Sequence, residues 1–363
     1  MNKLIFFLLL ISLNKVFAQE AENTFYIGHS LINLNIPAMT HSLSVDAGIS
    51  NDDYKYQIGN GANLWYQWDT LIGNEQGTPY QQALPTGTYD NLIFTEAIAL
   101  QGHIDWSDTY GYANKFCEYA HSFNPDIAMY VYETWHCLKS GTNEGCEWDP
   151  GNNIGWRQRL DDDLSLWENI ANYVLSGNPG FNVKLIPGGQ GMARLYDAIE
   201  AGTIIGRNDI SQFYSDDIHP NNDGNYFIAC IMFACIYERS PIGLTNQLHD
   251  EWGSPYPAIS PDIALRLQEL AWETVCEYGN SGVECIPSST KSIPNIDLYY
   301  DQPSQLLMLS KNYTGDIFLY NTNGMLVEKF SLNNDNNIDL NHLFSGAYFV
   351  KVNGGNTLKI LRR

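Results

Sequence analysis

The feature that most constrains this chain is the alternation, over residues 24–278, of short apolar runs with longer amphipathic stretches. Short apolar runs bounded by turn residues are typical of buried strands, and stretches with a 3.6-residue apolar period are typical of helices. Their alternation predicts an α/β fold with three α/β/α layers around a parallel, doubly wound sheet. We expect strands at 24–28, 54–58, 90–95, 127–132 and 183–187, and helices at 108–123, 156–176, 191–201, 222–238 and 260–278.

Pro and Ser interrupt this pattern at residues 286–295. Such clusters are typical of linkers, so we expect one domain at 19–285, a linker at 286–295 and a second domain at 296–363. In the second domain apolar and polar residues alternate with period two on both sides of an Asn-Gly turn, which is typical of antiparallel strands. The chain is therefore predicted to end in a small all-β sandwich.

Residues 1–18 have the pattern of a secretory signal peptide. Lys3 precedes an apolar run at 4–13, and Ala18 supplies a small residue for cleavage. The run is too short to span a bilayer comfortably, and no later stretch reaches about 18 apolar residues, so we expect no stable membrane insertion. The expected location is therefore secreted or at the cell surface.

The charge balance is strongly acidic, with 41 Asp and Glu against 19 Lys and Arg and a formal net charge of −22. Such a charge repels polyanions. Nucleic acid and anionic membrane surfaces are therefore excluded as main partners.

Seven cysteines stand in a chain that is predicted to be exported, where disulfides persist. Cys137 and Cys146 enclose a short polar loop that contains glycine, and so do Cys276 and Cys285. We expect these two bridges, with an unpaired buried thiol elsewhere. No cysteine has the spacing of a zinc site, and we expect neither a metal nor an organic cofactor.

Ligands of such sheets bind beyond the carboxyl ends of the strands. The first strand runs through Gly28 into Ser30, and the glycine allows the sharp turn that projects the serine hydroxyl beyond the sheet. Asp216 and His219 lie three residues apart in a polar loop before a helix. This spacing lets the carboxylate accept the Nδ1–H while Nε2 takes a proton from serine, which predicts a catalytic triad of the three side chains.

Two blocks resemble the SGNH (GDSL-like) hydrolase family, namely Gly-His-Ser-Leu at 28–31 and Asp-Asp-Ile-His at 216–219. Their order and wide separation carry the resemblance, which covers about residues 24–240. It implies a flavodoxin-like three-layer fold and hydrolysis of ester bonds by Ser30, His219 and Asp216. A serine that merely caps the following helix is the alternative for Ser30.

The same resemblance implies an oxyanion hole formed by the backbone N–H groups of Ser30 and Gly61. The family's third block, Gly-x-Asn-Asp, is absent, because Thr-Glu-Ala stands at 95–97 instead. Its side-chain amide donor therefore needs a substitute, since losing one such donor costs about 3 kcal/mol of barrier. The candidate donors are Asn60, which we place in the oxyanion hole, Asn63 and Gln190.

Other residues at strand ends are expected to border the cleft. We predict substrate contacts for Glu96, Trp135 and Gln190, because each follows a strand. Trp135 offers a flat face for a sugar ring, and ordinary packing is its alternative. His136 is a rival for the role of base, and Glu96 with Glu133 could form a carboxylate pair for glycoside cleavage.

The end of the chain resembles the C-terminal sorting domain of type IX secretion cargo in Bacteroidota. The residues that carry it are the Gly-x-Tyr-x-Val-x-Val core at 346–352 and the basic terminus at 358–363. The resemblance implies contact with the secretion machinery. A carbohydrate-binding β module is the alternative.

These observations together favour a secreted serine ester hydrolase that removes acetyl groups from extracellular polysaccharide, with an ester-bearing, acylated polysaccharide as its substrate. The choice of substrate rests on family analogy. Two alternatives stay open, namely a lipid or arylester hydrolase of the same mechanism and a glycan-binding protein without catalysis.

Overall fold

The computed structural model describes residues 22–49, 52–70, 75–149, 153–285, 298–321, 326–352 and 357–362. The expected signal peptide at 1–18 and linker at 286–295 lie outside them. The chain divides into two compact units, Met1–Glu284 and Cys285–Arg363. The predicted domain limits at 19–285 and 296–363 stay predictions.

The first unit is built on a six-stranded sheet with the order β3-β2-β1-β4-β5-β6. Five strands are parallel, and only β3 runs antiparallel to its neighbour β2. The predicted parallel α/β sheet is therefore confirmed, with β3 as an unpredicted edge strand of two residues. The strands are β1 (Thr24–Gly28), β2 (Tyr54–Ile58), β3 (Gln76–Gly77), β4 (Asn91–Phe94), β5 (Ala128–Tyr132) and β6 (Asn182–Ile186).

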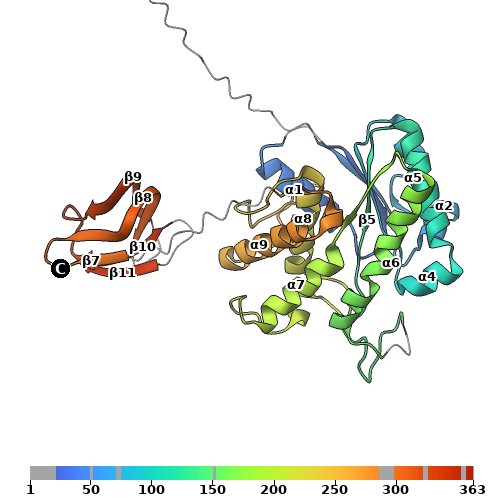
Figure 1. The fold of residues 1–363 in the computed structure, drawn as a ribbon. Coiled ribbons are helices and arrows are strands. Elements are labelled where there is room, and N and C mark those ends of the chain that lie inside the picture. Colours follow the sequence, from blue (N-terminus) through green and yellow to red (C-terminus); the bar gives the residue numbers. More distant parts are fainter. Residues whose placement is uncertain are drawn as a thin grey trace, which may run out of the picture. The chain divides into compact units, whose positions relative to one another are not determined.

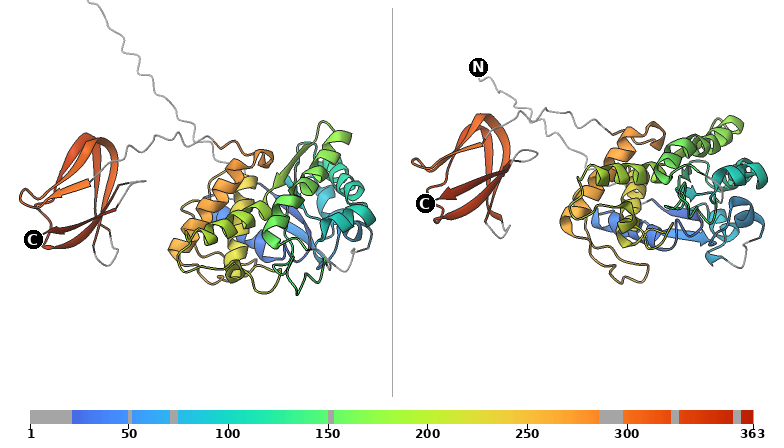
Figure 2. Two further views of the ribbon diagram at one scale, coloured as in Figure 1. Left: turned by 60° about the horizontal axis from the view of Figure 1, so that its bottom comes forward. Right: turned by 90° about the horizontal axis from the view of Figure 1, so that it is seen from below.

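Helices cover both faces of this sheet (Figure 1, Figure 2). One face carries α1, α7, α8 and α9, and the other carries α2, α4, α5 and α6. The helices are α1 (Asn35–Asp46), α2 (Leu64–Asp69), α3 (Tyr80–Ala83), α4 (Leu100–Trp106), α5 (Thr109–Phe123), α6 (Trp156–Gly177), α7 (Gly188–Glu200), α8 (Asn222–Tyr237) and α9 (Pro261–Glu277).

Successive side chains along each strand point to opposite faces of the sheet, so each strand contributes to two apolar clusters, one on each face. In β1, Tyr26 faces the cluster that packs against α1 and α8, whereas Phe25 and Ile27 face the cluster that packs against α5 and α6. The stripe predicted on residues 156–176 is buried as expected, because α6 contributes Trp167, Ile170 and Val174. Helix α8 is apolar on every side and almost wholly buried.

Two differences from the expected helices have local causes. We predicted no helix before residue 108, because the buried residues of α1 lie around most of its circumference and the short α2, α3 and α4 span too few turns to show a period. Helix α7 begins at Gly188 and not at residue 191. A Cβ on Gly188 would come within 2.6 Å of the Glu133 carbonyl oxygen, so glycine here allows the close approach of helix and strand rather than a loop.

The C-terminal unit is all-β, as predicted, and every strand pair in its described part is antiparallel. The long strand β8 pairs with β7, β9 and β10, and β10 pairs in turn with β11. Leu307, Ile317, Leu319 and Val350 are central to a small apolar core of its own. The strands are β7 (Leu298–Asp301), β8 (Leu306–Asn321), β9 (Leu326–Asp339), β10 (Gly346–Val352) and β11 (Thr357–Arg362).

Four of the seven cysteines are oxidised. Cys137 and Cys146 form the predicted disulfide. Cys276 and Cys285, the cysteines of the second predicted bridge, are both disulfide-bonded as well. The remaining thiols, Cys117, Cys230 and Cys235, are free and buried.

Candidate active site

Ser30 lies in a turn just beyond the carboxyl end of β1, and the preceding residue, His29, holds that turn in place. The Nδ1 atom of His29 accepts the backbone N–H of Leu31 at 3.3 Å, so Nε2 carries the proton and donates to the Glu96 carbonyl oxygen at 3.0 Å. Burial lowers the pKa of His29 to about 4. The ring is therefore neutral at neutral pH, with both nitrogens occupied by structural hydrogen bonds.

The structure brings Ser30, His219 and Asp216 into one relay. Ser30 Oγ lies 2.9 Å from His219 Nε2, and His219 Nδ1 lies 2.8 Å from Asp216 Oδ2. Asp216 Oδ1 accepts the backbone N–H groups of Ile218 at 2.9 Å and His219 at 2.7 Å. Partial burial acts to raise the pKa of Asp216, but these donors and the His219 ring outweigh it and lower the pKa below its ordinary value. An ionised Asp216 therefore orients the imidazole with Nε2 toward the serine.

The segment after β5 supports the loop that carries this pair. The Trp135 indole N–H donates to the Ile218 carbonyl oxygen at 2.9 Å. The backbone N–H of Leu138 donates to the Asp217 carbonyl oxygen at 2.8 Å, and that of Lys139 donates to Asp217 Oδ1 at 2.9 Å. Residues 135–139, about eighty positions earlier in the sequence, thus hold this loop from one side.

A pocket of about 320 Å³ opens onto Ser30 and His219, and we call it the triad pocket. Its remaining wall is mainly apolar and comes from the ends of several strands and from the loop after β5. The residues that line it besides these two are His29, Leu31, Asn60, Gly61, Ala97, Ile98, Trp148 and Ile218.

The predicted oxyanion residues border this pocket. Within the described residues nothing accepts the backbone N–H of Ser30 or that of Gly61, which has a φ of 69°. Asn60 lines the pocket beside them. The side-chain amides of the other two candidates, Asn63 and Gln190, already donate hydrogen bonds within the protein. Asn60 is therefore the remaining candidate for the missing amide donor.

Asn63 donates its amide to Ser107 Oγ at 3.0 Å and caps α2 by accepting the backbone N–H of Tyr66 at 2.8 Å. Gln190 donates its amide to Glu133 Oε1 at 3.0 Å and to the Leu160 carbonyl oxygen at 2.8 Å. Neither side chain lines the triad pocket.

The structure does not place Glu96, Trp135 or Gln190 against the triad pocket, which corrects their expected substrate contacts. Trp135 is fully buried beneath the loop at 216–219. Glu96 is buried too, and its carboxylate accepts the backbone N–H groups of Leu64 at 3.1 Å and Ala97 at 2.7 Å. These side chains were expected in the cleft because they follow strands. Trp135 and Glu96 instead turn inward to buried partners, and the half-buried Gln190 bonds to Glu133 and borders a separate pocket.

The alternative of a glycosidase carboxylate pair also finds no support in the geometry, because both acids are buried. Burial raises the pKa of Glu96 to about 7 and that of Glu133 to about 8. Glu133 accepts both the backbone N–H and the side-chain amide of Gln190, at 2.9 and 3.0 Å. The two carboxyl groups therefore serve the interior beneath the strand ends.

The rival base, His136, belongs to a buried ion-pair network and not to the triad pocket. Its Nε2 lies 2.7 Å from Asp163 Oδ2, and Arg159 donates to the same oxygen at 2.9 Å. Arg159 also pairs with Asp149. The Trp156 indole N–H donates to the His136 carbonyl oxygen at 3.0 Å. His136 thus helps to fix the disulfide-closed loop.

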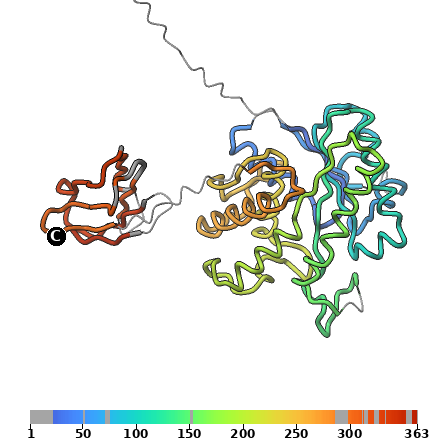
Figure 3. Tube along the Cα trace, in the orientation of Figure 1, coloured from blue at the N-terminus to red at the C-terminus, as the bar shows by residue number. Residues whose placement is uncertain are grey.

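Sequence reasoning missed Ile98 and Trp148, which both border the triad pocket. The only signal for Trp148 was a large aromatic residue in a polar stretch, Cys-Glu-Trp-Asp at 146–149, where an indole has no apolar neighbours in sequence. This loop projects at the bottom of the first unit in Figure 3, where it is coloured green.

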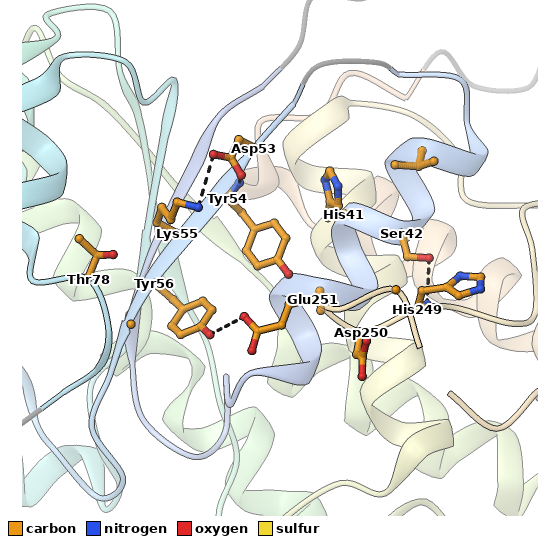
Figure 4. Close-up of a pocket in the computed structure, with 14 residues that line it drawn as sticks. His41, Ser42, Asp53, Tyr54, Lys55, Tyr56, Thr78, His249, Asp250 and Glu251 are labelled. Carbon is orange, nitrogen blue, oxygen red and sulfur yellow. Dashed lines mark hydrogen bonds and ion pairs between the residues drawn. The ribbon is translucent and has the colours of Figure 1, made fainter. Parts of the chain in front are cut away.

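A second groove, of about 640 Å³, lies between α1, β2 and the 249–253 turn (Figure 4). Tyr54 and Tyr56 lie side by side on β2, and the Tyr56 hydroxyl donates to Glu251 at 2.8 Å. Neither Ser30 nor His219 lines it. The groove is therefore separate from the triad pocket.

The described residues contain neither a metal-binding cluster nor a membrane-spanning helix. No group of three or more His, Cys, Asp and Glu side chains there could hold a metal ion. No helix in that part of the chain is long and apolar enough to cross a membrane.

Comparison with known proteins gives a match at the C-terminal end and one at the level of the fold. Residues 291–363 match the family model described as a secretion system C-terminal sorting domain. No curated protein matches the chain. Among solved structures, a DUF4886 family protein from Bacteroides uniformis is 17% identical with a TM-score of 0.53, over 72% of this chain and 96% of that one.

Two further structures are less similar. A GDSL-like lipase from Bacteroides thetaiotaomicron is 12% identical with a TM-score of 0.33, over 59% of this chain and 87% of that one. A carbohydrate esterase family 3 protein from Talaromyces cellulolyticus is 12% identical with a TM-score of 0.36, over 58% and 94%. The sheet order, the helices on both its faces and the sorting-domain match lead to one description. The chain joins a three-layer α/β/α unit, whose fold is similar to that of the DUF4886 family protein, to a C-terminal segment that is similar to a secretion system C-terminal sorting domain.

Proposed function

We propose that this protein is a secreted serine ester hydrolase and that Ser30, His219 and Asp216 are its catalytic residues. The observation that carries the proposal is the unbroken relay from Ser30 Oγ to His219 Nε2 at 2.9 Å and from His219 Nδ1 to Asp216 at 2.8 Å. A serine that only capped a helix would need no such relay, and α1 has no side-chain cap.

In the proposed reaction Ser30 Oγ attacks the ester carbonyl carbon while His219 Nε2 takes the hydroxyl proton. The backbone N–H groups of Ser30 and Gly61, with the Asn60 amide, stabilise the oxyanion. His219 then gives its proton to the leaving alcohol, and an acyl-enzyme remains. Water, deprotonated by His219, attacks this acyl group and releases the carboxylic acid and free Ser30.

We propose a short acyl group, such as acetyl, on an extracellular polysaccharide. The pocket at Ser30 is small, and its apolar wall of Leu31, Ile98 and Ile218 suits a short chain. A lipid hydrolase would need a longer apolar cleft. The sorting domain at 291–363 supports export to the cell surface or medium, where such polysaccharides occur.

The proposal is tested by acetate release from a panel of acetylated polysaccharides and small acetyl esters. Ser30→Ala should lower kcat by about 10⁶-fold without lowering the melting temperature, because it removes the nucleophile alone. Thr40→Ser, a conservative change in the neighbouring helix α1, is the control that should keep activity. Full activity of the Ser30→Ala chain would refute the assignment. Retained glycan binding by a wild-type chain that hydrolyses no ester would instead favour the non-catalytic alternative.

We further propose that the C-terminal unit is an address and takes no part in catalysis. A chain ending at Cys285 should keep its specific activity on small acetyl esters but should no longer be exported by the secretion machinery. Activity and location are read separately, by rate assay and by immunoblot of medium and cells. A folded, truncated chain with reduced activity would show that the second unit contributes to the substrate site.

A further inference from the structure

A groove of about 620 Å³ adjoins the triad pocket, and the two share Ile98 and Trp148. Two exposed tryptophans line this groove. Trp106, at the end of α4, is 88% exposed, and Trp148, in the loop after β5, is 56% exposed. By contrast Trp135, which we had expected to meet a sugar, is buried. The aromatic faces near Ser30 therefore come from two other segments.

Exposed indoles leave a large apolar surface in water, which a ligand that stacks on them would cover. The backbone that carries each of them is held by neighbouring contacts. Asp149, next to Trp148, pairs with the buried Arg159, and the Cys137–Cys146 disulfide closes the preceding loop. Beside Trp106, Ser107 donates its backbone N–H to the His103 carbonyl oxygen at 2.9 Å. Exposed aromatic faces that line a groove beside a pocket with polar groups are typical of a binding surface.

The rest of the groove includes several polar side chains and carries no unpaired cation among its described residues. Gln101, Asp105 and Ser107 supply hydrogen-bonding groups along it. Its one arginine, Arg159, is already paired with Asp149 and Asp163. Burial lowers the pKa of His103, so that ring is neutral at neutral pH. An acidic groove on a protein of net charge −22 disfavours anionic ligands.

Aromatic faces beside hydroxyl-binding groups match the two sides of a pyranose ring. The C–H groups of a sugar carry partial positive charge and lie well against the negative face of an indole, while its hydroxyls need donors and acceptors at the edge. We propose that the Trp106–Trp148 groove binds neutral sugar units of the acylated polysaccharide, and that this contact presents an ester on a neighbouring unit to Ser30. The inference rests on the proposed function and names the substrate class of the same site.

The first experiment measures binding without catalysis, by titration calorimetry with the Ser30→Ala chain. Xylohexaose, mannohexaose and hexagalacturonate are the probes. One neutral hexasaccharide should bind, and Trp106→Ala and Trp148→Ala should each raise its Kd by about tenfold, since each removes one stacking face. Trp252→Ala is the matched control, because Trp252 is 79% exposed and lines neither groove, and it should leave Kd unchanged.

Several outcomes would overturn the proposal. They are the absence of binding by every neutral probe, tighter binding of hexagalacturonate, or an unchanged Kd in the Trp106→Ala/Trp148→Ala double variant. All three substituted residues are exposed, so the variants are expected to fold, and their melting temperatures check this.

The second experiment separates the groove from the triad. The substrates are p-nitrophenyl acetate and either acetylated xylan or acetylated mannan, whichever backbone binds. In Trp106→Ala, kcat/KM on the polysaccharide should fall about tenfold relative to kcat/KM on p-nitrophenyl acetate, mostly because KM for the polysaccharide rises. A larger loss on p-nitrophenyl decanoate than on the acetylated polysaccharide would show an acyl chain in the groove and overturn the proposal. If the wild-type chain hydrolyses no ester but binds a neutral hexasaccharide through the two tryptophans, the proposed function fails while the sugar site stands.

Discussion

His219 and His136 form two His–Asp pairs of nearly equal length but opposite orientation. The Asp216 carboxylate meets Nδ1 of His219 at 2.8 Å, and Nε2 is left facing Ser30. Asp163 meets Nε2 of His136 at 2.7 Å, and Nδ1 has no partner within the described residues. The side chain of His219 is 37% exposed and that of His136 only 3%. A carboxylate neighbour therefore does not make a histidine a base, because the other ring nitrogen must also reach a nucleophile.

Replacing each histidine in turn should produce the largest difference between the two pairs. His219→Asn should lower kcat on a small acetyl ester by about 10⁶-fold, because no group remains to take the serine proton. His136→Asn should keep kcat within about threefold but lower the melting temperature, because a buried network loses a member. Steady-state rates and thermal melts check both. An inactive but stable His136→Asn chain would show that the base was assigned to the wrong histidine.

Replacing the two aspartates should have smaller effects that differ in kind. Asp216→Asn should lower kcat by about 10⁴-fold and so retain more activity than His219→Asn, because it disturbs only the tautomer and orientation of the imidazole. Its effect on stability should be small, since the position is exposed. Rates measured for both variants in the same assay decide the order, and equal losses would contradict it.

Asp163→Asn should act on stability and leave catalysis nearly intact. It leaves the buried Arg159 with one carboxylate partner, Asp149, and should lower the free energy of unfolding by about 2 kcal/mol. Denaturant melts measure this, and Asp162→Asn, on the exposed side of the same helix, is the control. Unchanged stability would mean that the network contributes little to the fold.

The smallest expected effect concerns Glu133, just before the His136 segment. Its folded-state pKa of about 8 lies above the unfolded value, so the folded state holds the proton more tightly and loses stability as pH rises toward 8. Glu96 acts with the same sign only up to about pH 7. His29, with its pKa lowered to about 4, acts with the opposite sign, losing stability as pH falls below 6.5.

The interval from pH 7 to 8 therefore reports mainly on Glu133. The free energy of unfolding should fall by about 1 kcal/mol across it, and Glu133→Gln should remove that slope whatever its effect on absolute stability. Urea melts at the two pH values measure the slope. A slope that persists in the variant would assign it to another group.

Much of the α/β unit could be predicted because its signals are local. Strands β1, β4 and β5 are short, mainly apolar runs, β2 and β6 mix polar with apolar residues, and the stripe on α6 repeats with helical period. The Asp216–His219 pair also lies within one loop, where spacing alone brings carboxylate and ring together. Ser30 follows directly after β1, so the parallel topology predicts that it lies at the edge of the sheet where the strands have their carboxyl ends.

The residue pattern could not predict where a side chain points, or whether it is buried, when its partners lie far away in the sequence. Trp135 is buried because residues 216–219 fold over it from 83 positions downstream. Glu96 turns inward to meet N–H groups on two separate segments.

Trp106 and Trp148 share one groove only because α4 and the segment that follows the Cys137–Cys146 loop border the same space. Local spacing in the sequence was thus enough to predict the five parallel strands, the helices with a clear period and a candidate triad. Tertiary packing decided which polar and aromatic side chains reach solvent, because burial depends on contacts that no local pattern encodes.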